Sequence, residues 1–162
     1  MNAVLVGFKR SPFTIANKGL LSKIRPEDIL SQVINDLIKT TNINKDDIED
    51  IIAGCAYPEG AQGYNIAKIV SFMTDMPEHV GGMTINRWCG SSMQAIHSAA
   101  GAISMNAGKV FICCGIESMT FVPINGLNYT PHPELLIDQP NVYLSMGLTA
   151  ENVAKKYNLS RK

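Results

Sequence analysis

Four cysteines carry most of the reactive chemistry in this 162-residue sequence, and Cys89 stands apart from the other three. It lies within TINRWCGSSMQAIHSAAGAI, where a predicted strand ends and a predicted helix begins. A thiol at the start of a helix faces backbone N–H groups without partners and the positive end of the helix dipole, which together favour the thiolate form. The same N–H groups can stabilise the oxyanion that forms when sulfur attacks a carbonyl. The position therefore indicates a nucleophile for covalent acyl transfer.

A buried structural cysteine is the alternative interpretation of Cys89, because free cysteines often pack in protein cores. Position alone leaves both interpretations open. Cys55, Cys113 and Cys114 lie in or at the ends of apolar predicted strands, where core packing explains them. The four cysteines are 34, 24 and 1 residues apart, which matches neither a CxxC pair nor a disulfide ladder. We therefore expect reduced thiols, a cytoplasmic location and no metal site.

The elements that must position Cys89 follow a strand–helix alternation. Segment 2–9 is apolar without polar alternation, which is typical of a strand buried on both faces. Further strands are predicted at 48–55, 80–87 and 109–115, and helices at 26–38, 64–76, 89–107 and 146–158. Repeated strand–helix–strand units predict an α/β fold with four mainly parallel strands and helices on both faces.

The predicted helix behind Cys89 has small residues around its whole circumference, whereas a surface helix shows one polar face. These residues are Gly90, Ser91, Ser92, Ala95, Ser98, Ala99, Ala100, Gly101, Ala102 and Ser104. The pattern predicts a helix packed on several sides, with backbones in close approach. We expect its cover to come from a partner chain or from sequence outside this chain.

Charge and hydropathy exclude two classes of function. Fourteen basic and 14 acidic side chains leave no net charge to attract nucleic acid or an anionic membrane surface. No apolar stretch approaches the ~20 residues of a membrane-spanning helix, and the N-terminus does not read as a targeting peptide. After about residue 119, prolines, glycines and asparagines replace the periodic pattern, which predicts a boundary between residues 1–118 and residues 119–162.

Four segments, in order, resemble the thiolase family: GCAYPEGAQGYNIAK, TINRWCGSSMQAIHSAAGAI, FICCGIESMTFVP and SMGLTAENVAKKYNLSR. Thiolases are acyl-CoA acyltransferases, so the resemblance implies that Cys89 takes the acyl group as a thioester while a 3-ketoacyl-CoA is cleaved or formed. It also implies that the Cys89 amide belongs to an oxyanion hole, and that a coenzyme A thioester is the substrate with no other cofactor and no metal. Met146 and Gly147 match a segment that lines the acyl pocket. Ser145 replaces a histidine that is frequent in short-chain biosynthetic members, which favours a fatty-acid-degrading enzyme of beta-oxidation.

The resemblance also implies an architecture. Thiolases have two similar halves stacked in five layers, with a loop domain inserted in the first half. Residues 1–118 then correspond to an incomplete N-terminal half and residues 119–162 to the beginning of the loop domain. The helix of small residues would lie in the shared central layer.

Further catalytic groups of the family lie in NEAF-, GHP- and CGGG-like segments, which this sequence lacks. His79, His97 and His132 do not match them. We therefore expect no turnover by this chain alone, and expect either a homo-oligomer or a complementing C-terminal thiolase half as partner. Two alternatives to a thiolase-type acyltransferase stay open: a non-catalytic thiolase-fold module or truncated remnant with an assembly role, and a condensing enzyme that uses acyl carrier protein. The thiolase-like segments argue against the second of these.

Overall fold

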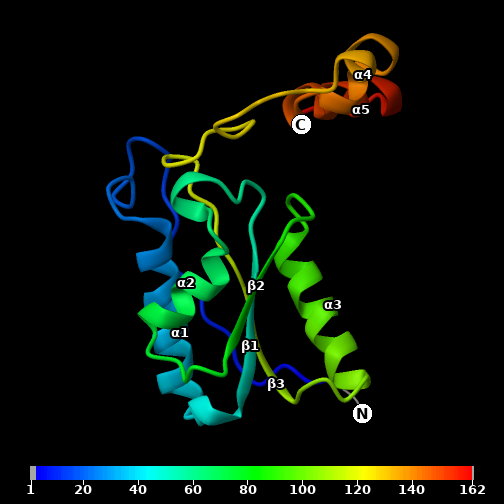
Figure 1. The fold of residues 1–162 in the computed structure, drawn as a ribbon. Helices are drawn as coiled ribbons and strands as arrows, with labels where there is room; N and C mark the ends of the chain where they lie inside the picture. Colours follow the sequence, from blue (N-terminus) through cyan, green and yellow to red (C-terminus); the bar gives the residue numbers. More distant parts are fainter. Residues whose placement is uncertain (1–2, 162) are drawn as a thin grey trace. The chain divides into compact units, whose positions relative to one another are not determined.

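The computed structural model describes residues 3–161, and the chain divides into two compact units. The larger unit is Met1–Leu127 and the smaller is Asn128–Lys162. Figure 1 labels the strands β1 to β3 and the helices α1 to α3 of the larger unit, and the helices α4 and α5 of the smaller one.

Three parallel strands form the sheet of the larger unit, in the order β2-β1-β3. They are β1 (Ile48–Gly54), β2 (Gly81–Ile85) and β3 (Val110–Gly115). In the centre of the sheet, Ile51 of β1 lies opposite Gly82 of β2 and Ile112 of β3. Because the strands are parallel, the loops that follow them all leave from one edge of the sheet.

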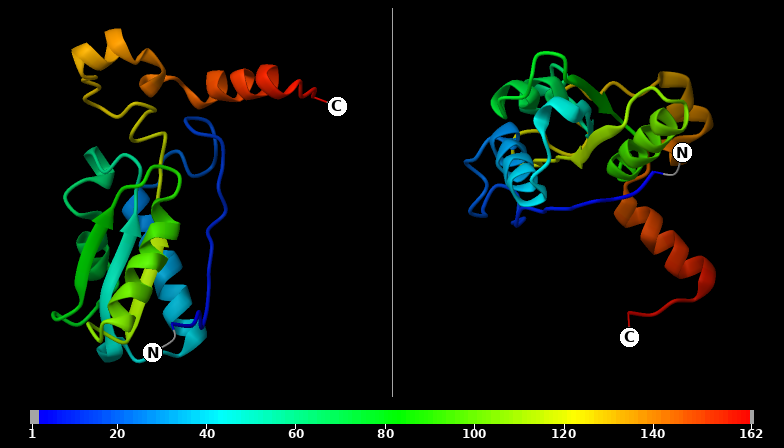
Figure 2. Two further views of the ribbon diagram at one scale, coloured as in Figure 1. Left: turned by 90° about the vertical axis from the view of Figure 1, so that its right-hand side faces the viewer. Right: turned by 90° about the horizontal axis from the view of Figure 1, so that it is seen from below.

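Helices cover both faces of the sheet, as the sequence predicted (Figures 1 and 2). Helices α1 (Pro26–Thr41) and α2 (Ile66–Met73) cover one face, and α3 (Ser91–Ser104) covers the other. The core on the first face is built from Leu30, Ile34, Ile38, Ile48, Ile51, Ala53, Ile66, Ala67, Val70, Val80 and Ile112. The core under α3 is smaller and consists of Ile52, Ala95 and Ala99.

Helix α1 forms where the sequence has both a start signal and an apolar stripe. Pro26 occupies the first helical position, where its missing N–H costs no hydrogen bond. Its buried side chains include Leu30, Ile34 and Ile38, which recur at helical spacing. The helix ends at Asn42, whose φ of 51° is left-handed.

Two short helices and one lysine connect these elements. The 3₁₀ helices η1 (Lys45–Asp47) and η2 (Gly60–Gln62) lie directly before β1 and between β1 and α2. The Lys45 ammonium group donates to the carbonyls of Thr74 and Asp75, at 2.7 and 3.3 Å, just beyond the end of α2. This charge lies at the negative end of the α2 dipole, where it stabilises the helix.

The predicted strand at 2–9 is wrong, so the sheet has three strands rather than four. Residue 2 lies outside the described residues, and residues 3–9 form no strand. Val4, Leu5, Val6 and Phe8 are between 75 and 91% exposed. The segment pairs with none of the three strands, although β2 and β3 each have a neighbour on one side only in the described part of the chain. An apolar run indicates a preference for burial, but it does not specify whether the segment pairs with a strand or with which one.

Segment 6–9 instead approaches the end of α1. The Lys9 ammonium group lies 2.8 Å from the Asp36 carboxylate. A Cβ atom on Gly7 would lie 2.5 Å from the Thr41 methyl group, so the backbone passes close to this helix only because residue 7 is glycine.

The smaller unit contains α4 (Pro133–Asp138), the 3₁₀ helix η3 (Pro140–Tyr143) and α5 (Met146–Tyr157). The Ser145 hydroxyl caps α5 by accepting from the Leu148 N–H at 3.3 Å, and Asn158 ends the helix in a left-handed conformation. None of the described residues of this unit is buried. The helices at 133–143 were not predicted, because two prolines interrupt the apolar spacing there.

Candidate functional site

Cys89 lies in the five-residue turn between the end of β2 at Ile85 and the start of α3 at Ser91. Its side chain is exposed, whereas Cys55 is buried and Cys113 and Cys114 are partly buried. The turn leaves the carboxyl edge of a parallel sheet, which is where open α/β sheets bind their ligands. Cys89 therefore places an accessible sulfur at the carboxyl edge of the sheet, where α/β proteins of this kind bind their ligands.

Hydrogen bonds from residues before and after Cys89 maintain the conformation of the turn that contains it. Trp88 has a left-handed φ of 49°, and its N–H donates to the Asn86 side-chain oxygen at 2.8 Å. The Ser91 hydroxyl donates to the Trp88 carbonyl at 2.6 Å and accepts from the Arg87 N–H at 2.8 Å. Because a left-handed conformation is unfavourable for a bulky residue, these bonds are what maintain it.

The backbone amides at this corner are partly engaged within the turn. The Gly90 N–H donates to the Arg87 carbonyl and the Ser91 N–H to the Trp88 carbonyl, both at 3.0 Å. Because the Gly90 and Ser91 N–H groups already donate within the turn, an oxyanion hole at this corner would have to use other backbone amides. The expected role of the Cys89 amide stays a prediction.

Two glycines bring the first turn of α3 against the sheet edge. A Cβ atom on Gly54, the last residue of β1, would collide with the backbone of Ser91 and Ser92. A Cβ atom on Gly115, the last residue of β3, would collide with the Ser92 hydroxyl. Absence of both Cβ atoms therefore fixes how closely the helix behind Cys89 approaches the strands.

The other three cysteines are protected as thiols. Burial and the nearby Glu117 carboxylate raise the pKa of Cys55 to about 12. Burial and the neighbouring Cys113 sulfur raise the pKa of Cys114 to about 12, and burial raises the pKa of Cys113 as well. At neutral pH these sulfurs are unreactive thiols, which leaves the exposed Cys89 as the accessible one.

Met146 and Gly147, the predicted acyl-pocket residues, begin α5 in the smaller unit. The Met146 side chain is 69% exposed. Cys89 lies in the larger unit, and the assignment of Met146 and Gly147 to an acyl pocket stays a prediction.

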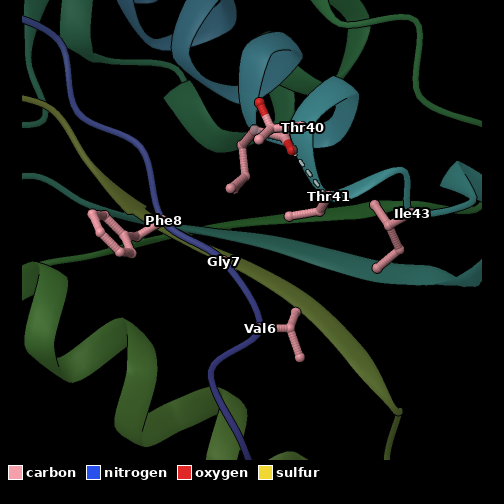
Figure 3. Close-up of a pocket in the computed structure, with 7 residues that line it drawn as sticks. Val6, Gly7, Phe8, Thr40, Thr41 and Ile43 are labelled. Atoms are coloured by element: carbon pink, nitrogen blue, oxygen red, sulfur yellow. Dashed lines mark hydrogen bonds between the residues drawn. The ribbon is translucent and has the colours of Figure 1, made fainter.

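A cavity of about 550 Å³ lies elsewhere, between segment 6–8 and the end of α1 (Figure 3). Its lining is Val6, Gly7, Phe8, Leu37, Thr40, Thr41 and Ile43. The Thr41 hydroxyl already donates to the Leu37 carbonyl at 2.8 Å. The lining holds no ionisable or nucleophilic side chain other than hydroxyls, so it offers no groups for acyl transfer.

The histidines and the other side chains that could bind a metal ion are spread over the described part of the chain. Within residues 3–161, no cluster of three or more His, Cys, Asp or Glu side chains is arranged to hold a metal ion. His79, His97 and His132 are all exposed, and His97 lies on α3. The expectation that no metal or cofactor is required stays a prediction.

Comparison with known proteins decides the family. A model of the thiolase N-terminal domain matches residues 3–162. The chain belongs to the thiolase family. It is 39% identical over 160 residues to a 3-ketoacyl-CoA thiolase of Bacillus subtilis (strain 168), which covers 99% of this chain and 41% of that protein. It is 36% identical over 163 residues to a 3-ketoacyl-CoA thiolase of Aeromonas salmonicida (strain A449), covering 99% of this chain and 42% of that one.

Solved thiolases share the fold. The crystal structure of the Acat5 thiolase from Ascaris suum in complex with coenzyme A matches with a TM-score of 0.73 and 28% identity, over 90% of this chain and 41% of that one. The Bacillus anthracis acetyl-CoA acetyltransferase matches with a TM-score of 0.72 and 26% identity, over 88% and 39%. This thiolase-family chain thus corresponds to the N-terminal portion and spans about two fifths of the length of these relatives. In the described part of the chain, no helix is both long and apolar enough to span a membrane.

Sequence reasoning missed two side chains at this edge of the sheet: Asn86, whose oxygen accepts from the Trp88 N–H, and Glu117, whose carboxylate accepts from the Ala56 N–H in the loop after β1. Asn86 and Glu117 lie in segments that carry the family resemblance, but neither received a role. Both follow parallel strands, and the loops after parallel strands meet at one edge of the sheet. This rule could have indicated from the sequence that Asn86 and Glu117 lie at the same edge of the sheet as Cys89.

Proposed function

We propose that this thiolase-family chain carries the nucleophile of an acyl-CoA acyltransferase, with Cys89 holding the acyl group as a thioester. The single observation that supports the proposal most is the contrast among the cysteines. Cys89 is exposed at the start of α3, whereas burial keeps Cys55, Cys113 and Cys114 as thiols. The relatives named 3-ketoacyl-CoA thiolases support the reaction class.

In the proposed cleavage, the Cys89 thiolate attacks the C3 carbonyl of a 3-ketoacyl-CoA, and a carbon–sulfur bond forms. The C2–C3 bond then breaks, and its electron pair leaves on the enolate of acetyl-CoA, which takes up a proton. The thiol of free coenzyme A, after losing its proton, attacks the acyl thioester and releases acyl-CoA and the Cys89 thiolate. Condensation is the reverse of these steps.

Each of those steps also needs a proton donor or acceptor beside the sulfur. In the family these groups come from the NEAF-, GHP- and CGGG-like segments, which this sequence lacks. We therefore propose that this chain alone accepts an acyl group slowly and does not turn over. Loss of such partners costs roughly 10⁴ to 10⁶ in rate in well-studied enzymes.

The proposed substrates are coenzyme A thioesters of the fatty-acid beta-oxidation type, with no resident cofactor or metal. The coenzyme A complex of the similar Ascaris suum thiolase supports the substrate class. Ser145, which caps α5 immediately before Met146 and Gly147, supports the degradative type over the short-chain biosynthetic one. Four free cysteines are consistent with the reducing cytoplasm, which we propose as the location.

The proposed partner is a second copy of the chain or a complementing C-terminal thiolase half. Helix α3 supports this, because only Ser91, Ala95 and Ala99 are buried against the sheet. On its other side, Met93 is 56% exposed and Ile96 is 39% exposed. An exposed apolar strip on a helix next to the nucleophile is typical of a surface that another layer covers.

Acyl transfer to the chain tests the proposal. The chain is incubated with acetyl-CoA that carries an isotopic label on the acetyl group, and its peptides are analysed by mass spectrometry. We expect label on the peptide that contains Cys89, no label in Cys89→Ala, and unchanged label in the control Cys55→Ala. A full-length 3-ketoacyl-CoA thiolase treated in parallel shows that the conditions permit acylation.

A second measurement adds the missing chemistry. Co-expression with the remaining portion of a 3-ketoacyl-CoA thiolase is expected to give thiolysis of acetoacetyl-CoA, which Cys89→Ala abolishes. Thiolysis that survives Cys89→Ala would show that Cys89 is not the nucleophile. A chain that assembles with this portion but never acquires label supports the alternative, a non-catalytic module with an assembly role.

A further inference from the structure

We propose that Glu117 is a positioning residue that fixes the Cys89 turn through hydrogen bonds across the carboxyl edge of the sheet. The inference rests on the proposed function, because it takes Cys89 as the nucleophile. It assigns Glu117 no contact with substrate. Glu117 acts through the backbone of the loop after β1 and through Asn86.

The first step joins the loop after β3 to the loop after β1. One oxygen of the Glu117 carboxylate accepts from the Ala56 N–H at 2.7 Å, and the other accepts from the Gln62 side-chain amide at 2.8 Å. The Gln62 amide also donates to the Tyr57 carbonyl at 2.9 Å, and its oxygen accepts from the Ser118 N–H. Because Gln62 is fully buried, these bonds cannot be exchanged for bonds to water without cost.

The second step joins the loop after β1 to the turn after β2. The Asn86 side-chain N–H donates to the Ala56 carbonyl at 2.9 Å, and the Asn86 oxygen accepts from the Trp88 N–H at 2.8 Å. Ala56 is therefore held at its N–H by Glu117 and at its carbonyl by Asn86. The Tyr57 ring makes a second contact between the loop after β1 and the turn after β2, because it packs edge-on against the Trp88 ring with centroids 5.2 Å apart.

The last step reaches Cys89 itself. Trp88 precedes the nucleophile, and its left-handed φ of 49° sets the direction in which the chain enters Cys89. Such a conformation is unfavourable for a bulky L-residue, so it persists only when the surroundings hold it. Loss of the bond from Asn86, or of the carboxylate that orients Ala56, would let the turn relax and displace the sulfur. A displacement of about 1 Å can slow an enzymatic step roughly 100-fold.

A carboxylate suits this position better than an amide. The groups that lie against the Glu117 carboxylate are the Ala56 N–H, the Gln62 amide and the Cys55 thiol, and an ionised carboxylate offers acceptors to all of them. Glutamine has the same shape but would point an N–H₂ group at one of these donors. Glu117→Gln therefore breaks one tie without changing the volume of the side chain.

Trp88 provides a direct measurement of the turn, because it is the single tryptophan of the chain. We compare wild type, Glu117→Gln, Asn86→Ala and Asn86→Asp with the control Glu49→Gln, an exposed carboxylate near the amino end of β1. Asn86→Asp keeps the acceptor for the Trp88 N–H and loses the donor to Ala56. Each variant is assayed in the folded state for acrylamide quenching of Trp88 and for the rates of Cys89 alkylation and acylation.

We expect Glu117→Gln and Asn86→Ala to change Trp88 quenching and to slow Cys89 acylation roughly 10- to 100-fold under conditions in which each variant is folded. Asn86→Asp is expected to fall between wild type and Asn86→Ala. The double variant should be no slower than the slower single variant, because both changes interrupt one path. Glu49→Gln should match wild type in every assay.

Wild-type values for Glu117→Gln would overturn the positioning role, as would fully additive effects in the double variant. If Glu117→Gln does not fold, Asn86→Asp decides, since Asn86 is exposed and this change removes the bond to Ala56 while it keeps the acceptor for the Trp88 N–H. Wild-type values for Asn86→Asp would then overturn the role. Failure of the proposed function is distinguishable: wild type then takes no acyl label, while Trp88 quenching and Cys89 alkylation still report whether Glu117 holds the turn.

Discussion

At the scale of residues, the environment of each sulfur separates the four cysteines. Cys55 is buried, and its thiol lies 3.9 and 4.0 Å from the two oxygens of Glu117. A thiolate there would lose solvation and would stand beside a like charge, so the neutral thiol is favoured. The Cys89 side chain, by contrast, is exposed in the turn between β2 and α3.

Alkylation at several pH values tests this separation. A thiol with a pKa of about 12, as at Cys55 and Cys114, is a thiolate in only about one molecule in 10⁴ at pH 8. We expect iodoacetamide to label Cys89 first, and labelling of the other two to rise roughly tenfold per pH unit up to about pH 11. Mass spectrometry of the labelled peptides gives the rates. Equal labelling of all four cysteines at pH 8 would contradict the prediction.

Alkaline pH should also lower the stability of the fold through Cys55. Its pKa rises from an ordinary 9.0 to about 12 in the folded chain, so the unfolded chain loses the proton first as pH increases. The stability that the neutral Cys55 thiol contributes to the folded chain is fully present below about pH 9 and is lost as the pH approaches 12. We expect Cys55→Ala to lose less stability than wild type between pH 8 and pH 10.5, measured as urea midpoints. A Cys55→Ala curve parallel to that of wild type would refute the assignment.

At the scale of elements, the approach of α3 to the sheet depends on glycine at the end of β1. The Cβ atom of Gly54→Ala would meet backbone atoms of Ser91 and Ser92, which cannot move aside as a side chain can. We expect a loss of about 1–3 kcal/mol in unfolding free energy, with slower acylation of Cys89. Chemical denaturation and the acyl-transfer assay measure the two effects.

Gly101→Ala is the matched control within α3, since no heavy atom lies within 4 Å of its added Cβ. The same substitution there should raise stability by about 0.5–1 kcal/mol, because alanine favours the helix over glycine. A neutral Gly54→Ala would mean that α3 shifts without cost, and the close approach would then not position the corner.

The elements that the sequence predicted well are those whose signals are local. Pro26 and the stripe through Leu30, Ile34 and Ile38 specify α1 within one stretch of chain. The strand predicted at 2–9 is wrong because pairing depends on residues distant in the sequence, which an apolar run does not specify. The Cys89 corner was visible as a change from strand to helix. The tie from Ala56 to Glu117 joins residues 61 positions apart, which no local pattern reveals.

At the scale of the molecule, the buried core lies entirely within Met1–Leu127. The smaller unit exposes apolar side chains such as Ile137 and Leu148, at 80 and 55%. A unit of this size is below the roughly 40 residues that a single hydrophobic core usually requires. The larger unit also leaves apolar side chains exposed to solvent. Helix α3 exposes Met93 and Ile96, and α2 exposes Phe72 at 65%.

These exposed surfaces predict self-association of the isolated chain. Contact between α3 faces would remove Met93 and Ile96 from water at about 25 cal/mol per Å² of apolar surface. We expect the mass from light scattering to increase with concentration, and expect the double variant Met93→Gln/Ile96→Gln to reduce that increase. Phe72→Gln/Met73→Gln removes two exposed apolar side chains from the opposite layer and should reduce it less. A monodisperse monomer at every concentration would show that the exposed face of α3 does not drive association. Equal effects of the two double variants would show that association does not depend on this face more than on α2.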